Sequence, residues 1–333
     1  VNPWRLALLF FISGVAIRFA TDKAESLRRF ASSRLARLGL PLVFGVYVWV
    51  MPQAYYQVKQ SGEFLGSMFS FYPDYVAITQ AFSTITPTWN HLWYLAYLLV
   101  YILLVLAFLP WLRCVPESRV WQAASAQPLV IVFVLILPFV VTETWLSPVF
   151  PTTHDLVNDW ANHAHRFMIF LIGFFAAKDE RFWSSVDRAW KFAPILAIIA
   201  WIVLQNGQEV SDWTGQFLSG TSQRFLFSYM AILYAWSCML TLLGFGQRFL
   251  NRKSLLLRYL TGAIFCYYVL HQTITVVAGY YLTECRLGVA VESALVLGVT
   301  VAGCVLGYEL IRRTPKVGIL FGVHDVSGYR SGR

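Results

Sequence analysis

Two arginines three residues apart, Arg34 and Arg37, lie in the most basic segment of the chain, residues 28–41. On a helix, side chains with this spacing share one face. Two guanidinium groups on one face can hold a diphosphate or a 3′-phosphate through paired, charge-assisted hydrogen bonds. Arginines beside a membrane also neutralise anionic lipid headgroups. The spacing alone leaves both interpretations open.

A histidine near the middle of an apolar run, His271, is a second candidate for chemistry. Tyr267 precedes it by one turn and Thr275 follows it by one turn, which predicts a polar stripe on one helix face. An imidazole is suited to act as a base near neutral pH, and polar groups inside a bilayer are functional candidates. A hydrogen bond to a neighbouring helix would explain the residue equally well. Farther along, Glu309 lies beside Arg312 and Arg313 and is expected to form a structural ion pair.

Other histidines occur among aromatic and amide residues rather than among Lys and Arg. His91 and Trp93 stand where an apolar run begins, and His163 and His165 lie two residues apart within 154–166. Imidazoles can hydrogen-bond to sugar hydroxyls, and aromatic rings pack against pyranose faces or form a belt at the membrane surface. We expect His91, Trp93 and His163 on a carbohydrate-binding side. The histidine spacing matches no zinc pattern, so no metal site is expected.

The composition is that of a membrane protein. Hydrophobic residues make up 58% of the 333 residues and charged residues only 13%, whereas soluble domains average about 45–50% and about 25%. The net charge of +9 does not indicate nucleic-acid binding, because the basic residues are spread in short runs between apolar stretches. Five cysteines show no CxxC or Cys/His metal spacing. The expected partner is the lipid bilayer.

Long apolar runs predict an all-α, polytopic bundle. A helix needs roughly 20 residues to cross a hydrocarbon core of about 30 Å. About nine runs meet or approach this length, namely 4–20, 38–56, 91–112, 127–146, 162–177, 189–205, 225–245, 258–282 and 289–311. The runs are too long for barrel strands and lack alternation at period two.

The connections between these runs alternate in charge. Of the 26 Lys and Arg residues, 21 fall in one set of connections and only 5 in the other. Basic connections face the cytoplasm, which places the segments 57–90 and 146–161 outside. The C-terminus is then cytoplasmic, and the simplest division is one membrane domain over 1–312 followed by a cytoplasmic tail over 313–333.

Six segments in order resemble the Acyltransferase 3 family of bacterial inner-membrane proteins. They read LFFISGVAI (9–17), RLARLGLP (34–41), HLWYL (91–95), FLIGFF (170–175), RYLTGAIFCYYVLHQ (258–272) and YELIRR (308–313). The set covers nearly the whole chain and is most similar to the branch that includes glucan biosynthesis protein C. The resemblance implies an acyltransferase of the inner membrane.

The resemblance also implies a substrate pair. The family moves an acyl group from cytoplasmic acyl-CoA to a hydroxyl of an envelope or exported carbohydrate, with acyl-CoA as a co-substrate and no bound cofactor. Its Arg-x-x-Arg motif falls on Arg34 and Arg37, which are then expected to bind the acyl-CoA phosphates. A polytopic transporter or flippase of a glycan or small solute is the alternative, although no Gly/Pro-broken helix pair or similarity between halves supports it.

One family feature has no counterpart in the sequence. Family members carry an essential histidine in their first spanning helix, and the resemblance here begins at the second. We therefore expect a further helix upstream of Val1, ten in all, that carries the catalytic histidine. The catalytic residue within this chain is unassigned, and His271 is expected to support the site rather than to act as the base.

Overall fold

The computed structural model describes residues 3–77 and 81–323, and within these residues every regular secondary-structure element is a helix, without a strand. The all-α prediction is confirmed. The chain divides into two compact units: unit 1 is Val1–Ala31 with Val100–Arg252, and unit 2 is Ser32–Leu99 with Lys253–Arg333. Of the expected tail, residues 324–333 lie outside the described residues.

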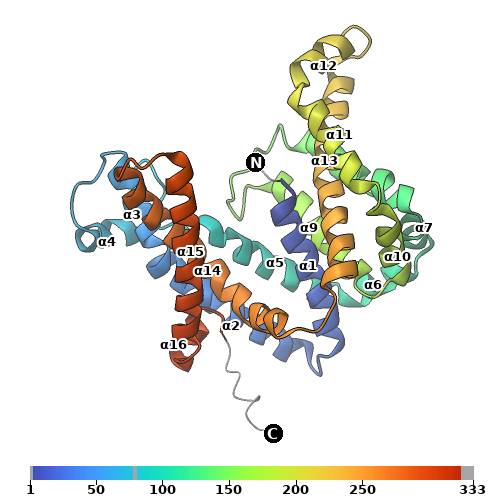
Figure 1. Cartoon of the computed structure of the whole chain (residues 1–333). Coiled ribbons are helices and arrows are strands. Elements are labelled where there is room, and N and C mark those ends of the chain that lie inside the picture. The colour runs from blue at the N-terminus through green and yellow to red at the C-terminus, as the bar shows by residue number, and fades with distance from the viewer. Residues whose placement is uncertain (1–2, 78–80, 324–333) are drawn as a thin grey trace. The chain divides into compact units, whose positions relative to one another are not determined.

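Unit 1 is built around two helix pairs, α1 against α9 and α11 against α13 (Figure 1). The pair α1 and α9 meets at two glycines. A Cβ on Gly14 would lie 2.0 Å from the Phe170 carbonyl oxygen, and a Cβ on Gly173 would lie 2.1 Å from that of Phe11. Small residues allow such close backbone contact between membrane helices. The helices of unit 1 are α1 (Pro3–Asp22), α6 (Leu109–Cys114), α7 (Arg119–Ala126), α8 (Leu137–Val141), α9 (Trp160–Ala176), α10 (Glu180–Ala189), α11 (Ala193–Gln205), α12 (Gly207–Thr214) and α13 (Gly220–Phe245).

Unit 2 centres on α14 and α15, which run side by side in Figure 1. Gly303 and Gly307 of α15 lie one turn apart and contact Ile274 and Leu270 of α14. The α3 helix packs on the same α14. The helices are α2 (Leu27–Phe44, which begins in unit 1), α3 (Met51–Gln60), α4 (Met68–Val76), α5 (Trp93–Ala107, which continues into unit 1), α14 (Leu255–Glu284), α15 (Val289–Ile311) and α16 (Pro315–Leu320).

Six helical segments within the described residues are long and apolar enough to span a membrane, or eight if two bent pairs each count as one span. They include Trp4–Asp22, Asn90–Ala107, Gly220–Leu250 and Leu255–Glu284. The expected span at 162–177 falls in α9, whose 17 residues extend about 26 Å at 1.5 Å per residue. That is short of a ~30 Å hydrocarbon core. The count of about nine therefore stays a prediction.

The most basic segment of the chain, residues 28–41, is helical. The α2 helix begins at Leu27 and continues through the π-turn Gly45–Trp49 into α3, so that Leu27–Gln60 forms one long segment. Residues 28–37 are thus the first turns of a spanning helix. Sequence reasoning placed this span at 38–56 because charged residues lower the hydropathy of its first turns.

In unit 1, Lys and Arg side chains near helix ends form ion pairs with two aspartates from other segments. Asp22 accepts a hydrogen bond from Arg113 Nη2 at 3.0 Å and pairs with Lys178 Nζ at 2.5 Å. Arg248 Nη2 pairs with Asp187 at 3.0 Å. These residues come from connections that the charge pattern assigned to one side, so the contacts agree with that alternation.

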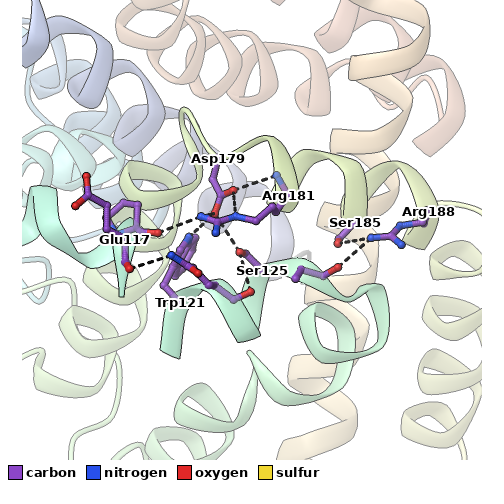
Figure 2. Close-up of polar contacts among 10 residues, drawn as sticks. Glu117, Trp121, Ser125, Asp179, Arg181, Ser185 and Arg188 are labelled. Atoms are coloured by element: carbon purple, nitrogen blue, oxygen red, sulfur yellow. Dashed lines mark hydrogen bonds and ion pairs between the residues drawn. The ribbon is translucent and has the colours of Figure 1, made fainter. Parts of the chain in front are cut away.

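A buried carboxylate, Asp179, joins α7 to the start of α10 (Figure 2). Trp121 Nε1 donates to its Oδ2 at 2.7 Å, Ser125 Oγ donates at 3.0 Å, and Arg181 Nε donates to Oδ1 at 2.9 Å. Burial alone would raise the pKa of Asp179, but the hydrogen bonds from Arg181, Trp121 and Ser125 lower it below its ordinary value. Arg188 extends the link by donating to the Ala126 carbonyl oxygen at 3.0 Å.

Candidate functional site

Unit 2 contains a polar cavity of about 390 Å³ between α3, α14 and the segment before α5. Its wall is rich in amide and hydroxyl groups and includes no charged side chain. The lining residues are Gln53, Tyr56, Gln57, Gln60, Asn90, Gln272, Val276, Gly279, Tyr280 and Thr283. We call this space the amide cavity. Uncharged donors and acceptors of this kind complement the hydroxyl groups of a neutral ligand.

A chain of side-chain hydrogen bonds fixes one wall of the amide cavity. Gln53 is 2% exposed; its Nε2 donates to Thr273 Oγ1 at 2.6 Å, and its Oε1 accepts from Asn90 Nδ2 at 3.0 Å. Thr273 Oγ1 in turn donates to the Trp49 carbonyl oxygen at 2.8 Å. Three separate segments are thereby held together by groups that would be costly to bury unpaired.

Asn90 has an unusual backbone conformation. Its φ is +41°, in the left-handed region that asparagine tolerates better than most residues. The short 3₁₀ turn Asn90–Leu92 follows and leads directly into α5. An asparagine at this point both turns the chain and reaches Gln53, and it thereby fixes the position of the next residue, His91.

His91 and His271 lie together, with ring centroids 5.2 Å apart and rings nearly perpendicular. His271 Nδ1 contacts the Tyr268 carbonyl oxygen at 2.7 Å, and His91 Nε2 contacts that of Val269 at 3.3 Å. A carbonyl oxygen only accepts, so these nitrogens carry the protons in both neutral rings. Nδ1 of His91 and Nε2 of His271 are then the basic nitrogens. Nδ1 of His91 is buried without a hydrogen-bond partner among the described residues.

Tyrosines and one lysine form the rim beside the amide cavity. Tyr56 and Tyr281 share a hydrogen bond of 2.8 Å between their hydroxyls. Lys59 Nζ lies over the rings of Tyr55 and Tyr280, at 5.5 Å and 5.9 Å from their centroids. The ammonium group is attracted to the negative faces of both rings. The rim therefore offers aromatic faces as well as hydroxyl groups.

The two arginines lie at the other end of the same helical segment. Arg34 is half-buried and Arg37 is exposed, and their charges are close enough to interact. Both belong to Leu27–Gln60, which also carries Gln53. From Arg37 to Gln53 the axis runs about 24 Å at 1.5 Å per residue. The arginines and the amide cavity are thus separated by most of a bilayer core.

Comparison with known proteins gives one match. The sequence model of the Acyltransferase 3 family, described as an acyltransferase domain, matches residues 1–309. The chain belongs to this family. It is a membrane acyltransferase that transfers groups other than aminoacyl groups. No curated protein and no solved structure matches it significantly. That Arg34 and Arg37 form the Arg-x-x-Arg motif of the family stays a prediction.

The other sequence-predicted residues have separate surroundings. Trp93 is 6% exposed and packs edge-on against Tyr97, with 4.8 Å between the ring centroids. His163 belongs to unit 1, where its Nδ1 contacts Tyr101 Oη at 3.0 Å and its Nε2 contacts the Leu156 carbonyl oxygen at 2.9 Å. Both ring nitrogens of His163 therefore have protein partners, whereas Nδ1 of His91 has none among the described residues. Their role on the carbohydrate side of the acyltransferase stays a prediction.

Three further observations complete the inventory. The expected ion pair is confirmed, with Arg312 Nη2 at 2.5 Å from Glu309 Oε2. Sequence reasoning missed Gln53 and Gln272, because a neutral amide in an apolar helix carries no distinctive signal. Among the described residues, no three His, Cys, Asp or Glu side chains converge closely enough to hold a metal ion.

Proposed function

We propose that this acyltransferase moves an acyl group from acyl-CoA to a hydroxyl of an envelope or periplasmic carbohydrate, in the bacterial inner membrane. The observation that carries the proposal is the amide cavity. A neutral carbohydrate presents many hydroxyls and no charge, and a wall of Gln53, Gln57, Asn90 and Gln272 side chains offers both donors and acceptors to them. A charged acceptor would favour a wall that carries the opposite charge.

The arginine pair supports acyl-CoA as the donor. The CoA moiety carries a diphosphate and a 3′-phosphate, and two guanidiniums on one helix face can bind such groups through paired hydrogen bonds. Arg37 is exposed and Arg34 half-buried, so phosphates can reach the pair. Arginine is favoured over lysine at such a site because its planar fork matches the phosphate oxygens.

The arginine pair and Gln53 are far apart along Leu27–Gln60, which suits an acyl donor and a carbohydrate acceptor on opposite sides of the membrane. Arg34 and Arg37 lie near the end of this segment that the charge pattern predicts to be cytoplasmic, where acyl-CoA is made. Gln53 lies about 24 Å farther along the axis, toward the side predicted to face outward. The orientation is tested with the exposed native cysteines Cys114 and Cys285. An impermeant maleimide should label Cys285 in intact cells and Cys114 only after permeabilisation; the reverse pattern would contradict the orientation.

The reaction transfers the acyl group from a thioester to a hydroxyl, which gives an oxygen ester. The acceptor hydroxyl oxygen attacks the thioester carbonyl carbon, a base removes the hydroxyl proton, and CoA leaves as the thiolate, which takes up a proton. The basic Nδ1 of His91 is expected to accept a hydrogen bond from an acceptor hydroxyl. His271, 5.2 Å from His91 between ring centroids, is expected to hold that ring in place. The resemblance implies that the base itself is a further histidine.

The proposal is tested by following a radiolabelled acyl group from acyl-CoA to a neutral glucan. The complete natural protein is compared with Gln53→Leu and with the control Gln216→Leu, which alters an exposed glutamine in unit 1. Gln53→Leu removes two side-chain hydrogen bonds and leaves Asn90 and Thr273 without their partner, each worth about 1 kcal/mol. KM for the glucan should rise about tenfold or more, while acyl-CoA binding and the control stay unchanged.

Two results would contradict the proposal. The absence of any label in the glucan, with folded protein and intact acyl-CoA, would reject carbohydrate as the acceptor. An equal KM for the glucan in Gln53→Leu and Gln216→Leu would reject the amide cavity as the place where the carbohydrate binds.

A further inference from the structure

Three cationic side chains of unit 1 surround a single carboxylate, that of Asp22. Arg113 Nη2 lies 3.0 Å from Asp22 Oδ1, and Lys178 Nζ lies 2.5 Å from Oδ2. Arg18 Nε lies 3.5 Å from the same Oδ2. The three cations come from segments far apart in the sequence, namely α1, the last turn of α6 and the turn that follows α9. We call these four residues the Asp22 cluster.

The Asp22 cluster has too little negative charge to balance its cations. Three positive charges and one negative charge give it a net charge of +2. Among the described residues, no other carboxylate lies within ion-pairing distance of any of the three cations. Asp179 follows Lys178 directly, but its carboxylate binds Arg181 and the side chains of α7 instead (Figure 2).

The excess positive charge lies where water only partly reaches it. The Arg18 side chain is 16% exposed. Arg18 Nη1 and Arg113 Nε are buried and make no hydrogen bond with any described residue. Burying charge that is not neutralised costs free energy, and buried polar groups are paired in most proteins. A second anion beside the Asp22 cluster would therefore offset a charge that Asp22 leaves unbalanced.

Two of the cations are open to such an anion. The Lys178 side chain is 49% exposed and that of Arg113 is 40% exposed. An ammonium group has three N–H donors, so Lys178 can hold Asp22 and a second anion at once. Arg113 binds Asp22 and the Thr21 carbonyl oxygen through Nη2 alone, which leaves its other terminal nitrogen, Nη1, without a hydrogen-bond partner among the described residues.

The surroundings of the Asp22 cluster favour an anion that carries hydrocarbon. Asp22 is the last residue of the apolar segment Trp4–Asp22, which is long enough to span a membrane. Lys178 Nζ lies 5.7 Å from the centroid of the Phe19 ring, and that ring is exposed. Trp111, on the same short helix as one of the cations, is also exposed. A membrane lipid places its phosphate at the end of a spanning helix and its acyl chains beside apolar side chains.

We infer that the Asp22 cluster binds the phosphate group of an anionic lipid, with Lys178 and Arg113 donating to the phosphate oxygens and the acyl chains beside Phe19. Arginine and lysine are both suited to this group, since the planar guanidinium can bind two oxygens and the ammonium acts as a compact point charge. The inference goes beyond the proposed function, because it concerns neither the acyl donor nor the acceptor.

The inference is tested first on the natural protein with two lipids that share the same acyl chains. Dioleoyl phosphatidylglycerol and dioleoyl phosphatidylcholine are titrated into the complete natural protein in detergent, and the first bound lipid is followed by native mass spectrometry. Both lipids carry a phosphate, but only phosphatidylglycerol has a net negative charge. Phosphatidylglycerol should bind at least tenfold more tightly, and equal affinities for the two lipids would overturn the inference.

Variants then locate the bound lipid. Lys178→Gln and Arg113→Gln each remove one cation from the Asp22 cluster, whereas the matched controls Lys191→Gln and Arg119→Gln each remove one exposed cation elsewhere in unit 1. Each cluster variant should weaken phosphatidylglycerol binding about fivefold or more, as expected for one cation beside an anionic lipid, and the controls should bind as the natural protein does. Unchanged binding in Lys178→Gln, or an equal loss in the controls, would place the lipid elsewhere and overturn the inference.

Coenzyme A distinguishes a lipid phosphate from a soluble one, because it carries phosphates without a fatty chain. It is titrated into the natural protein and into Lys178→Gln, and its affinity should be the same for both. If Lys178→Gln weakens coenzyme A binding and leaves phosphatidylglycerol binding unchanged, the Asp22 cluster holds a soluble phosphate and the lipid is rejected. Acyl transfer is not a readout of these experiments, so the inference and the proposed function can fail independently.

Discussion

Replacing Gly173 by alanine should separate α1 from α9, and the size of the effect follows from the contact itself. The added Cβ would lie 2.1 Å from the Phe11 carbonyl oxygen and 3.0 Å from the Phe11 Cα. Non-bonded heavy atoms settle at about 3.5–4.0 Å, and both partners are backbone, so no side-chain rotation relieves the contact. The helices must move apart by roughly 1 Å or more. Overpacking of this kind costs about 1–3 kcal/mol in the free energy of unfolding.

Gly298→Ala is the matched control, because it makes the same chemical change in a helix where nothing lies within 4 Å of the new Cβ. There only the backbone preference acts, and alanine in a helix is more stable than glycine by about 0.5–1 kcal/mol. We expect Gly173→Ala to melt at a lower temperature than the natural protein in detergent, and Gly298→Ala to melt at the same or a higher temperature. Equal melting temperatures of the two variants would refute the close α1–α9 contact.

Three further predictions concern side chains. Arg34→Lys and Arg37→Lys should each weaken acyl-CoA binding about tenfold in calorimetry, because lysine loses the bidentate fork. Unchanged binding at normal protein levels would mean that both arginines only set the orientation of the chain in the membrane. His271→Gln should lower kcat partially, whereas complete loss with normal folding would make His271 the base. Asp179 has a lowered pKa, so the stability it contributes is full above about pH 3.9 and is lost as the pH falls through the lower folded value. The Asp179→Asn variant should therefore melt at a lower temperature than the natural protein near neutral pH, and its melting temperature should fall less on acidification. An equal fall in melting temperature for both proteins would contradict this.

Much of the fold could be predicted because bilayer physics leaves few choices. Apolar runs of sufficient length must be helical, and both α14 and α15 fall where the sequence predicts spans. The boundary of α2 was harder to predict, because its first turns carry charges and read as a loop although they are helical.

The candidate site could be predicted only in part. His91 and His271 are conspicuous in sequence, since a histidine in an apolar run is rare, yet nothing in the sequence indicates that their rings are 5.2 Å apart. The link from Gln53 to Thr273 joins residues 220 positions apart, and glutamines near helix ends are common. His163 was singled out for the same reason as His91, but its ring nitrogens already have protein partners. Pairing of this kind depends on tertiary contacts that local patterns do not encode.

The most direct test of the proposed function is transfer across a sealed membrane. The complete natural protein is reconstituted into liposomes with radiolabelled acyl-CoA on the side of Arg34 and Arg37 and a neutral glucan on the side of the amide cavity. We predict label in the glucan as an alkali-labile ester, formed only when donor and acceptor are on these respective sides. Folded protein that hydrolyses or binds acyl-CoA without forming this ester, or that moves the glucan without acyl-CoA, would contradict the account.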